Sequence, residues 1–138
     1  MDTRGTHLLV ELRGARRALL DDAQVLEKLL LEAAARASAR VVQAAFHRFQ
    51  PEGVTGFLLL EESHLSIHTW PAQGYAAVDF YTCGASDPRP ALVFLAEALE
   101  AEQVEWLSVK RGARKLSHAG DTSPTMQVSG DAWPRNRV

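Results

Sequence analysis

From residue 56 to residue 71 the chain reads Gly56-Phe57-Leu58-Leu59-Leu60-Glu61-Glu62-Ser63-His64-Leu65-Ser66-Ile67-His68-Thr69-Trp70-Pro71. The runs 56–60 and 65–69 have the length and composition of strands, and the polar residues 61–64 between them are typical of a break. Proline cannot donate to a β-ladder, so the second run ends at Pro71. We therefore predict two strands whose connection carries acidic, hydroxyl and imidazole groups, which must be hydrogen-bonded or functional if buried.

Outside this stretch the sequence predicts two helices and further strands. Asp21 and Asp22 precede an amphipathic helix with an apolar stripe at Val25, Leu26, Leu29, Leu30, Ala33 and Ala34. Asp87 before Pro88 marks the start of a second helix, with Leu92, Leu95, Ala96 and Leu99 on one face. Strands are expected at residues 7–12, 40–49, 75–82 and 103–110, and Pro51-Glu52-Gly53 marks a turn.

This order of elements predicts an α+β fold. We expect a two-layer α/β sandwich, in which a mostly antiparallel sheet is covered on one face by two helices. Residues 1–112 are expected to form a single domain, which is a usual length for one hydrophobic core. Residues 113–138 are rich in Gly, Ser, Pro and Asn, and we expect a polar, poorly ordered C-terminal tail there.

Composition excludes several classes of function. Fifteen basic and seventeen acidic residues nearly cancel, so no strong field is expected to attract nucleic acid or an anionic membrane. No apolar run approaches the roughly 20 residues that span a bilayer. The single cysteine cannot form an internal disulfide, and the charged N-terminal region lacks the apolar stretch of a signal peptide. We expect a cytoplasmic protein.

Ser63 is the candidate for the central chemistry. Its hydroxyl can attack the carbonyl of Glu62, which converts the Glu62–Ser63 amide into an ester; elimination then leaves a dehydroalanine, and hydrolysis gives a pyruvoyl group. Such a reaction needs a neighbouring group that shuttles protons and stabilises the oxyanion, and His68 and Thr55 are the local candidates. We therefore expect self-cleavage between Glu62 and Ser63 into chains 1–62 and 63–138.

A pyruvoyl ketone is an electron sink that forms a Schiff base with a substrate amine and stabilises the carbanion left by decarboxylation. That carbanion needs a proton donor. Cys83, the only thiol of the chain, follows a predicted strand and can face the mouth of a pocket. The residues therefore suggest a decarboxylase that acts on a small amine-bearing molecule.

The same residues carry a resemblance to a known family. The chain resembles the bacterial and archaeal S-adenosylmethionine decarboxylase proenzymes over roughly residues 6–112, in Thr6-His7-Leu8, Phe46-His47-Arg48-Phe49 with Pro51 and Gly53, residues 62–71, Gly74-Tyr75-Ala76-Ala77-Val78-Asp79 and Thr82-Cys83-Gly84. The motif between Glu62 and Pro71 is long and contiguous. A chance match of that length is not expected.

The resemblance implies roles for individual residues. Ser63 would be the precursor of the covalently bound pyruvoyl group, His68 the acid/base of processing and Cys83 the catalytic proton donor. Phe49 and Trp70 match positions near the adenosyl group of the substrate. The resemblance further implies a homodimer of cleaved two-chain protomers, with active sites completed across the interface, that supplies the aminopropyl donor for spermidine and other polyamines.

Two positions depart from the family pattern. Thr55 replaces a serine that assists processing, and it keeps the hydroxyl group. Ala72 follows Trp70-Pro71 where the family has glutamate, a residue expected to bind the ribose hydroxyls of the nucleoside. Loss of that acceptor would cost on the order of 1.5–3 kcal/mol of binding. Ornithine or arginine therefore stays open as an alternative substrate.

Other interpretations of these residues compete with the enzyme. Ser63 can be an ordinary turn serine, Cys83 a buried small hydrophobe, and Phe49 and Trp70 core or interface aromatics. His64 and His68 share a face at this spacing only on a helix, so we predict no metal site, and His64 has a structural role. A non-catalytic paralogue is a third interpretation, although a binding module would need neither Ser63, His68 nor Cys83.

Overall fold

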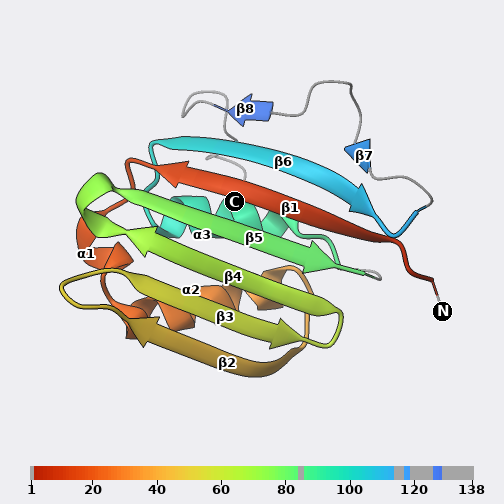
Figure 1. Ribbon diagram of the computed structural model, residues 1–138, viewed down its shortest axis with the longest axis horizontal. Coiled ribbons are helices and arrows are strands. Elements are labelled where there is room, and N and C mark those ends of the chain that lie inside the picture. Colours follow the sequence, from red (N-terminus) through yellow and green to blue (C-terminus); the bar gives the residue numbers. More distant parts are fainter. Residues whose placement is uncertain (1, 84–85, 114–116, 119–125, 129–138) are drawn as a thin grey trace.

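The computed structural model describes residues 2–83, 86–113, 117–118 and 126–128. Its central feature is one antiparallel sheet with two long helices on one face (Figure 1). The strands are β1 (Gly5–Arg13), β2 (Val41–Arg48), β3 (Val54–Leu60), β4 (Ser63–Trp70), β5 (Tyr75–Thr82), β6 (Gln103–Arg111), β7 (Ser117–His118) and β8 (Met126–Val128). The helices are α1 (Arg17–Leu20), α2 (Ala23–Arg36) and α3 (Arg89–Ala98), and a 3-10 turn, η1, spans Pro71–Gln73.

The strand order is β2-β3-β4-β5-β1-β6-β7, with β8 also paired to β6. Every one of these pairings is antiparallel. The two strands predicted around the polar break are β3 and β4, which pair directly through a tight connection at residues 61 and 62. The predicted two-layer α+β sandwich is therefore confirmed.

The core lies between the sheet and the two helices. Alternate residues of each central strand point toward the helices and are buried, as the two-residue period of a strand requires: Leu8, Val10 and Leu12 of β1, Leu58 and Leu60 of β3, Leu65 and Ile67 of β4, and Val78 and Phe80 of β5. The apolar faces of α2 and α3 pack against these strand residues, and their buried side chains are Leu26, Leu30, Ala33, Ala34, Leu92, Leu95 and Ala96. The predicted helical faces are thus the buried ones.

The helix boundaries follow from capping. Asp22 is the N-cap of α2, and its side chain accepts hydrogen bonds from the backbone N–H groups of Gln24 and Val25. The second helix begins later than predicted: Pro88 is its N-cap, and Asp87 instead accepts from the Arg89 backbone N–H at 3.1 Å. The one-turn helix α1 has no predicted counterpart, because four residues are too few to show a helical period.

The other face of the sheet is not covered by a helix of the described residues (Figure 1). Three large apolar side chains on this uncovered face are partly exposed to solvent: Leu9 (41%), Phe57 (40%) and Leu59 (41%). Polar and ionisable side chains lie on the same face, because they occupy the alternate positions of β1, β4 and β5. We call this surface the open face, and the candidate site residues lie on it or at its edges.

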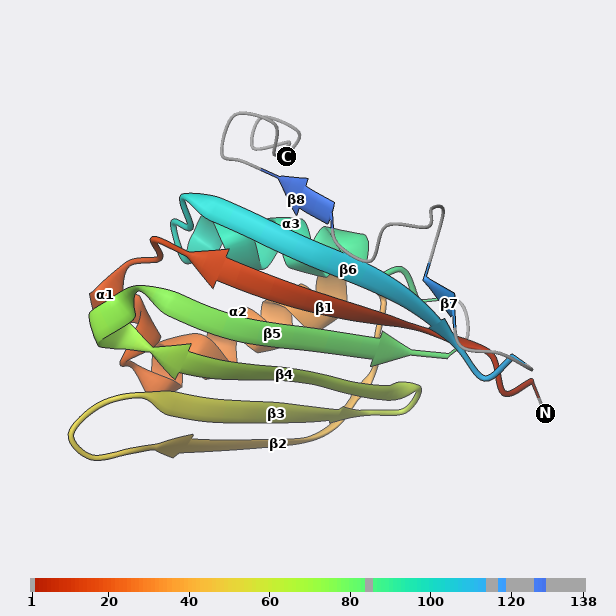
Figure 2. The same ribbon diagram turned by 45° about the horizontal axis from the view of Figure 1, so that its top comes forward.

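The C-terminal region was expected to be a polar, poorly ordered tail. Within the described residues, β7 and β8 each pair with the outer strand β6 (Figure 2). The remainder of the tail, including residues 129–138, lies outside the described residues. None of the helices in the described part of the chain is long and apolar enough to cross a membrane.

Candidate active site

Ser63 lies at the first position of β4, directly after the turn that connects β3 to β4. Its backbone φ angle is +152°, a conformation that L-residues rarely adopt. Strands on both sides fix this residue, because Ser63 is paired with Leu60 of β3 and with Thr82 of β5. The peptide bond between Glu62 and Ser63 is therefore held at a strained backbone position.

Cys83 follows β5 and contacts the residue before this peptide bond. Its backbone N–H donates to the carbonyl oxygen of Glu62 at 3.2 Å, and its thiol donates to the same oxygen at 3.0 Å. The Ser86 hydroxyl lies 3.4 Å from the Glu62 carboxylate. Two donors thus converge on one carbonyl, the geometry of a group that stabilises negative charge on an oxygen. Gly84 of the predicted motif lies outside the described residues.

His68 and Thr55 lie at the opposite end of the same pair of strands. They are directly opposite in the β3–β4 register, and the Thr55 hydroxyl lies 3.0 Å from Nδ1 of His68. His68 is five positions after Ser63 along β4, which corresponds to about 16 Å at the rise of a strand. The structure therefore brings together Ser63 with Cys83 and Thr55 with His68, but it does not bring these two pairs together within one chain.

Phe49 and Trp70 border a pocket beside His68. This pocket has a volume of about 340 Å³ and is lined by Phe49, Glu52, Gly53, Val54, Thr55, His68, Thr69, Trp70, Pro71 and Gln73. Phe49 and Trp70 are each 47% exposed, so neither is a core aromatic. Trp70 also stacks on Tyr75, with ring centroids 5.1 Å apart. The two aromatic residues and His68 thus line one concave surface.

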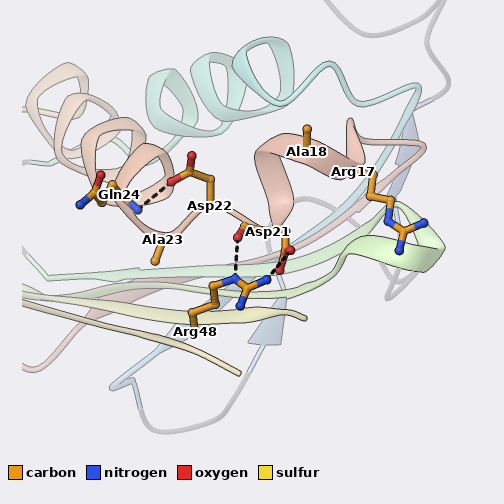
Figure 3. A pocket seen from close by; sticks show the side chains of 7 residues that line it. All are labelled: Arg17, Ala18, Asp21, Asp22, Ala23, Gln24 and Arg48. Carbon is orange, nitrogen blue, oxygen red and sulfur yellow. Dashed lines mark hydrogen bonds and ion pairs between the residues drawn. The ribbon is translucent and has the colours of Figure 1, made fainter. Parts of the chain in front are cut away.

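The loop that carries Phe49 is anchored by an ion pair. Arg48 donates to a carboxylate oxygen of Asp21 at 2.8 Å and to the Asp21 backbone carbonyl at 3.1 Å (Figure 3). The other Asp21 oxygen accepts from the backbone N–H of Gly53 at 2.9 Å. The hydrogen bond from the Gly53 backbone, followed by the hydrogen bond from the Arg48 guanidinium, holds the pKa of Asp21 below its ordinary value. The loop of residues 49–53 is therefore attached to the helical layer rather than free in solvent.

Tyr75 does not line this pocket, but its ring supports that of Trp70. Its hydroxyl donates to a carboxylate oxygen of Glu11 at 2.5 Å, and the Arg13 guanidinium lies over its ring. Burial, followed by the hydrogen bond to Glu11, raises the pKa of Tyr75 to about 12. Tyr75 therefore stays neutral at ordinary pH. Its hydrogen bond to Glu11 holds its ring in place, and Trp70 stacks on that ring.

Asp79 is the centre of a polar cluster on the open face. Its carboxylate accepts from Nε2 of His7 at 2.6 Å, from Nε2 of His64 at 2.9 Å and from the Ser66 hydroxyl. Burial alone would raise the pKa of Asp79, but these hydrogen bonds outweigh it and hold the pKa below its ordinary value. His64 also stacks on Phe57. The structural role predicted for His64 is thus that of a partner of Asp79.

The same cluster contains the atoms of a possible metal site, since one ligand atom each of His7, His64 and Asp79 lies within 4.8 Å of the others. However, Arg111 approaches Nδ1 of His7 to 3.1 Å, and a guanidinium can only donate. Nδ1 is then the acceptor, and Nε2 carries the proton that it donates to Asp79. In these contacts the cluster forms a hydrogen-bond network, in which His7 and His64 both reach the Asp79 carboxylate.

The sequence points to candidate residues at both ends of β4, but it does not single out two others that the structure places beside them, Asp79 and Glu52. In the sequence Asp79 is only one residue of a longer motif, because its partners come from β1 and β4 and their proximity depends on strand order. The sequence places Glu52 in a turn, and the structure shows that it also lines the pocket beside His68 and contacts residue 72. The sequence does contain a signal that could have pointed to Glu52: this turn carries an acidic residue, whereas position 72, where the family pattern has one, is alanine.

Comparison with known proteins identifies the family of this chain. The S-adenosylmethionine decarboxylase family model matches residues 6–112. An S-adenosylmethionine decarboxylase proenzyme of Caldicellulosiruptor saccharolyticus is 44% identical over 113 residues, which cover 81% of this chain and 91% of the relative. One from Geobacillus kaustophilus is 43% identical over 116 residues, covering 84% and 94%.

A solved structure is similar as well. The crystal structure of the adenosylmethionine decarboxylase of Aquifex aeolicus superimposes with a TM-score of 0.75 and 32% identity, over 89% of this chain and 100% of that one. In architecture the chain is a two-layer α+β sandwich domain. It belongs to the S-adenosylmethionine decarboxylase family. None of the relatives quoted is named for ornithine or arginine, the alternative substrates considered above.

Proposed function

We propose that this chain is a self-processing, pyruvoyl-dependent carboxy-lyase that decarboxylates S-adenosylmethionine and supplies the aminopropyl donor of spermidine synthesis. One observation carries the chemistry. The strained residue Ser63 follows a carbonyl, that of Glu62, which already accepts two hydrogen bonds from Cys83. Membership of the family supports the choice of S-adenosylmethionine over ornithine or arginine.

Processing begins at Ser63. Within the described residues its hydroxyl makes no side-chain hydrogen bond, so it is free to attack the Glu62 carbonyl carbon. The carbonyl oxygen gains negative charge, which the backbone N–H and thiol of Cys83 stabilise. The C–N bond then breaks as the nitrogen takes up the proton that the hydroxyl has lost, and Glu62 is held as an ester on the Ser63 oxygen. Removal of the Ser63 α-proton expels the Glu62 carboxylate, and hydrolysis of the resulting dehydroalanine releases ammonia and leaves the ketone.

The residues around Ser63 fit a pyruvoyl group formed in this way. Cleavage relieves the backbone strain at residue 63, because a pyruvoyl group has no preceding peptide bond and therefore no φ angle. When present, this group supplies an electron sink for loss of carbon dioxide from a substrate bound through its amine. Departure of Glu62 frees the Cys83 thiol from its acceptor. The thiol then donates a proton to the substrate carbon that has lost carbon dioxide.

The active form is proposed to be a homodimer. Ser63 and His68 lie on the same strand, about 16 Å apart at the rise of a strand, which is too far for proton transfer within one chain. A two-fold related copy packed on the open face, with the axis near the middle of β4, would place the Thr55–His68 pair of one chain beside Ser63 of the other. The exposed Leu9, Phe57 and Leu59 lie between the two ends and would be buried.

The pocket beside His68 is proposed to bind the nucleoside part of the substrate. Phe49 and Trp70 offer aromatic faces to a purine ring, and both are half-exposed in the single chain. His68, with Thr55 on its Nδ1, would move the proton during processing of the facing chain. A free thiol at Cys83 suits a reducing compartment, which supports the expected cytoplasmic location.

Mass spectrometry of the purified protein tests self-processing. We expect fragments of residues 1–62 and 63–138, the second blocked to N-terminal sequencing. Release of carbon dioxide should then be measured from S-adenosylmethionine, ornithine and arginine in parallel. An intact chain after long incubation would exclude self-processing, and release from only a free amino acid would exclude the proposed substrate.

A further inference from the structure

Glu52 places a carboxylate in the pocket that contains Phe49 and Trp70. Its Oε1 atom accepts from the backbone N–H of Ala72 at 3.2 Å, and its Oε2 atom is 3.0 Å from the guanidinium of Arg17. The Glu52 side chain is 24% exposed, whereas Arg17 is 69% exposed. Among the ten described residues that line this pocket, Glu52 is the only one with a carboxylate.

The substrate of the proposed reaction presents three chemically distinct parts to such a pocket. Its adenine ring needs an aromatic face, its ribose carries two neighbouring hydroxyl donors, and its sulfonium is a cation. A carboxylate accepts a hydrogen bond from each of two neighbouring hydroxyls, and it also attracts a positive charge. His68, Thr55 and Thr69 cannot replace it, because each lacks a pair of adjacent anionic acceptors.

We propose that Glu52 binds the ribose hydroxyls of S-adenosylmethionine and sets the preference for a nucleoside substrate. This inference rests on the proposed function and adds the residue that selects the substrate. Ala72 ends in a methyl group and offers no acceptor of its own, and the Glu52 carboxylate lies directly against the Ala72 backbone. The acid missing from position 72 is thus supplied from the adjacent turn, at residue 52.

The hydrogen bond to Ala72 also gives Glu52 a local role, since it satisfies a backbone N–H at the start of η1. The two roles predict different behaviour. A glutamine at this position still accepts from the Ala72 N–H through its amide oxygen, but it has neither the charge nor the second acceptor. The exposed ion pair with Arg17 contributes little to stability, so its loss is a minor effect.

The test is direct binding of 5′-methylthioadenosine and of its 2′,3′-dideoxy analogue to the processed protein, by titration calorimetry. In the wild type the parent nucleoside should bind at least tenfold more tightly than the analogue, which follows from hydrogen bonds to a charged group. Glu52→Gln should reduce this ratio to near one, raise the KM for S-adenosylmethionine about tenfold or more, and leave cleavage before Ser63 unchanged. The double variant Glu52→Gln with Ala72→Glu should restore the ratio.

Arg17→Gln is the matched control, because it removes the ion pair and keeps the carboxylate; its ratio should remain that of the wild type. An unchanged ratio in Glu52→Gln would overturn the inference, and so would an equal loss in Arg17→Gln. Failure of the proposed function is distinguishable from both outcomes. In that case the wild type would release no carbon dioxide from S-adenosylmethionine, whatever the nucleoside titrations show.

Discussion

The backbone N–H and the thiol of Cys83 both donate to the carbonyl oxygen of Glu62, at 3.2 and 3.0 Å. A strand end 21 residues further along the chain thus polarises the peptide bond before Ser63. The two donors differ in kind, because the N–H belongs to any residue at position 83 whereas the thiol belongs only to cysteine. Their contributions to cleavage and to turnover can therefore be separated by substitution.

Cys83→Ala should slow turnover far more than it slows cleavage. The variant keeps the backbone N–H that stabilises charge on the Glu62 oxygen, so we expect the half-time of cleavage to lengthen only a few-fold. Decarboxylation should fall at least a hundredfold, within the range that general acid catalysis contributes. Cleavage is followed by mass spectrometry and turnover by release of carbon dioxide. Unchanged turnover would remove the assigned role of the thiol.

The φ angle of +152° at Ser63 predicts a difference between two uncleavable variants. Ser63→Ala and Ser63→Gly both lack the hydroxyl and should remain intact. Glycine adopts positive φ without steric cost, so Ser63→Gly should be more stable than Ser63→Ala by about 1 kcal/mol. Urea unfolding of the two proteins measures this difference. A more stable alanine variant would show that the backbone at residue 63 is not strained.

The fold was predictable because its signals are local. The apolar periods at residues 56–60 and 65–69, the cap at Asp22 and the stripe from Val25 to Ala34 each depend on neighbours within one turn or one strand. The start of the second helix was predicted one residue too early. Asp87 was expected to be the N-cap, but Pro88 is the N-cap, and Asp87, the residue before it, accepts a hydrogen bond from the Arg89 backbone N–H. Local signals thus fixed the elements but not their exact ends.

Of the candidate site, only the residues that belong to one contiguous sequence motif could be predicted. Ser63 and His68 are close in sequence, yet an extended strand holds them apart, so their separation appears only once residues 63–70 are seen to be a single strand. Asp79 and Glu52 depend on contacts across the sheet and between two turns. No spacing rule within the sequence specifies such contacts.

Tyr75 should titrate well above an ordinary tyrosine. Its pKa is raised to about 12, first by burial and then by the hydrogen bond to Glu11. The stabilising effect of the neutral phenol is therefore fully present below pH 10 and is lost as the pH rises to about 12. Spectrophotometric titration of the two tyrosines, with Tyr75→Phe to assign them, checks this. Glu11→Gln should lower the pKa but leave it above 10, because burial remains.

Asp79→Asn should change the pH dependence of stability. Despite burial, hydrogen bonds from Ser66, His64 and His7 hold the pKa of Asp79 below the ordinary 3.8. Because the folded pKa is lowered, this stabilisation is present above about pH 4 and is lost as the pH falls through the folded pKa. Unfolding free energies should therefore favour the wild type at pH 6, and the gap should shrink below pH 4. A gap that stays constant from pH 6 to pH 3 would contradict this assignment.

Ser63 and His68 lie far apart on the same strand, so it can be tested whether His68 assists cleavage of its own chain or of the other chain of a dimer. In a shared site, the Ser63–Cys83 end of one copy faces the Thr55–His68 end of the other. A dimer of one His68→Ala chain and one Ser63→Ala chain then contains one complete site, formed by the serine of the first and the histidine of the second. The other site lacks both groups.

Co-expression of these two variants should therefore restore cleavage to one of them. We expect neither variant to be cleaved efficiently alone, because each lacks one required group at both sites. In the mixed dimer, isolated through different affinity tags on the two chains, the His68→Ala chain should be cleaved before Ser63 while the Ser63→Ala chain stays intact. Mass spectrometry distinguishes the two chains. If His68 instead acts on its own chain, the isolated mixed dimer should contain only intact chains, and the two-fold arrangement on the open face would be wrong.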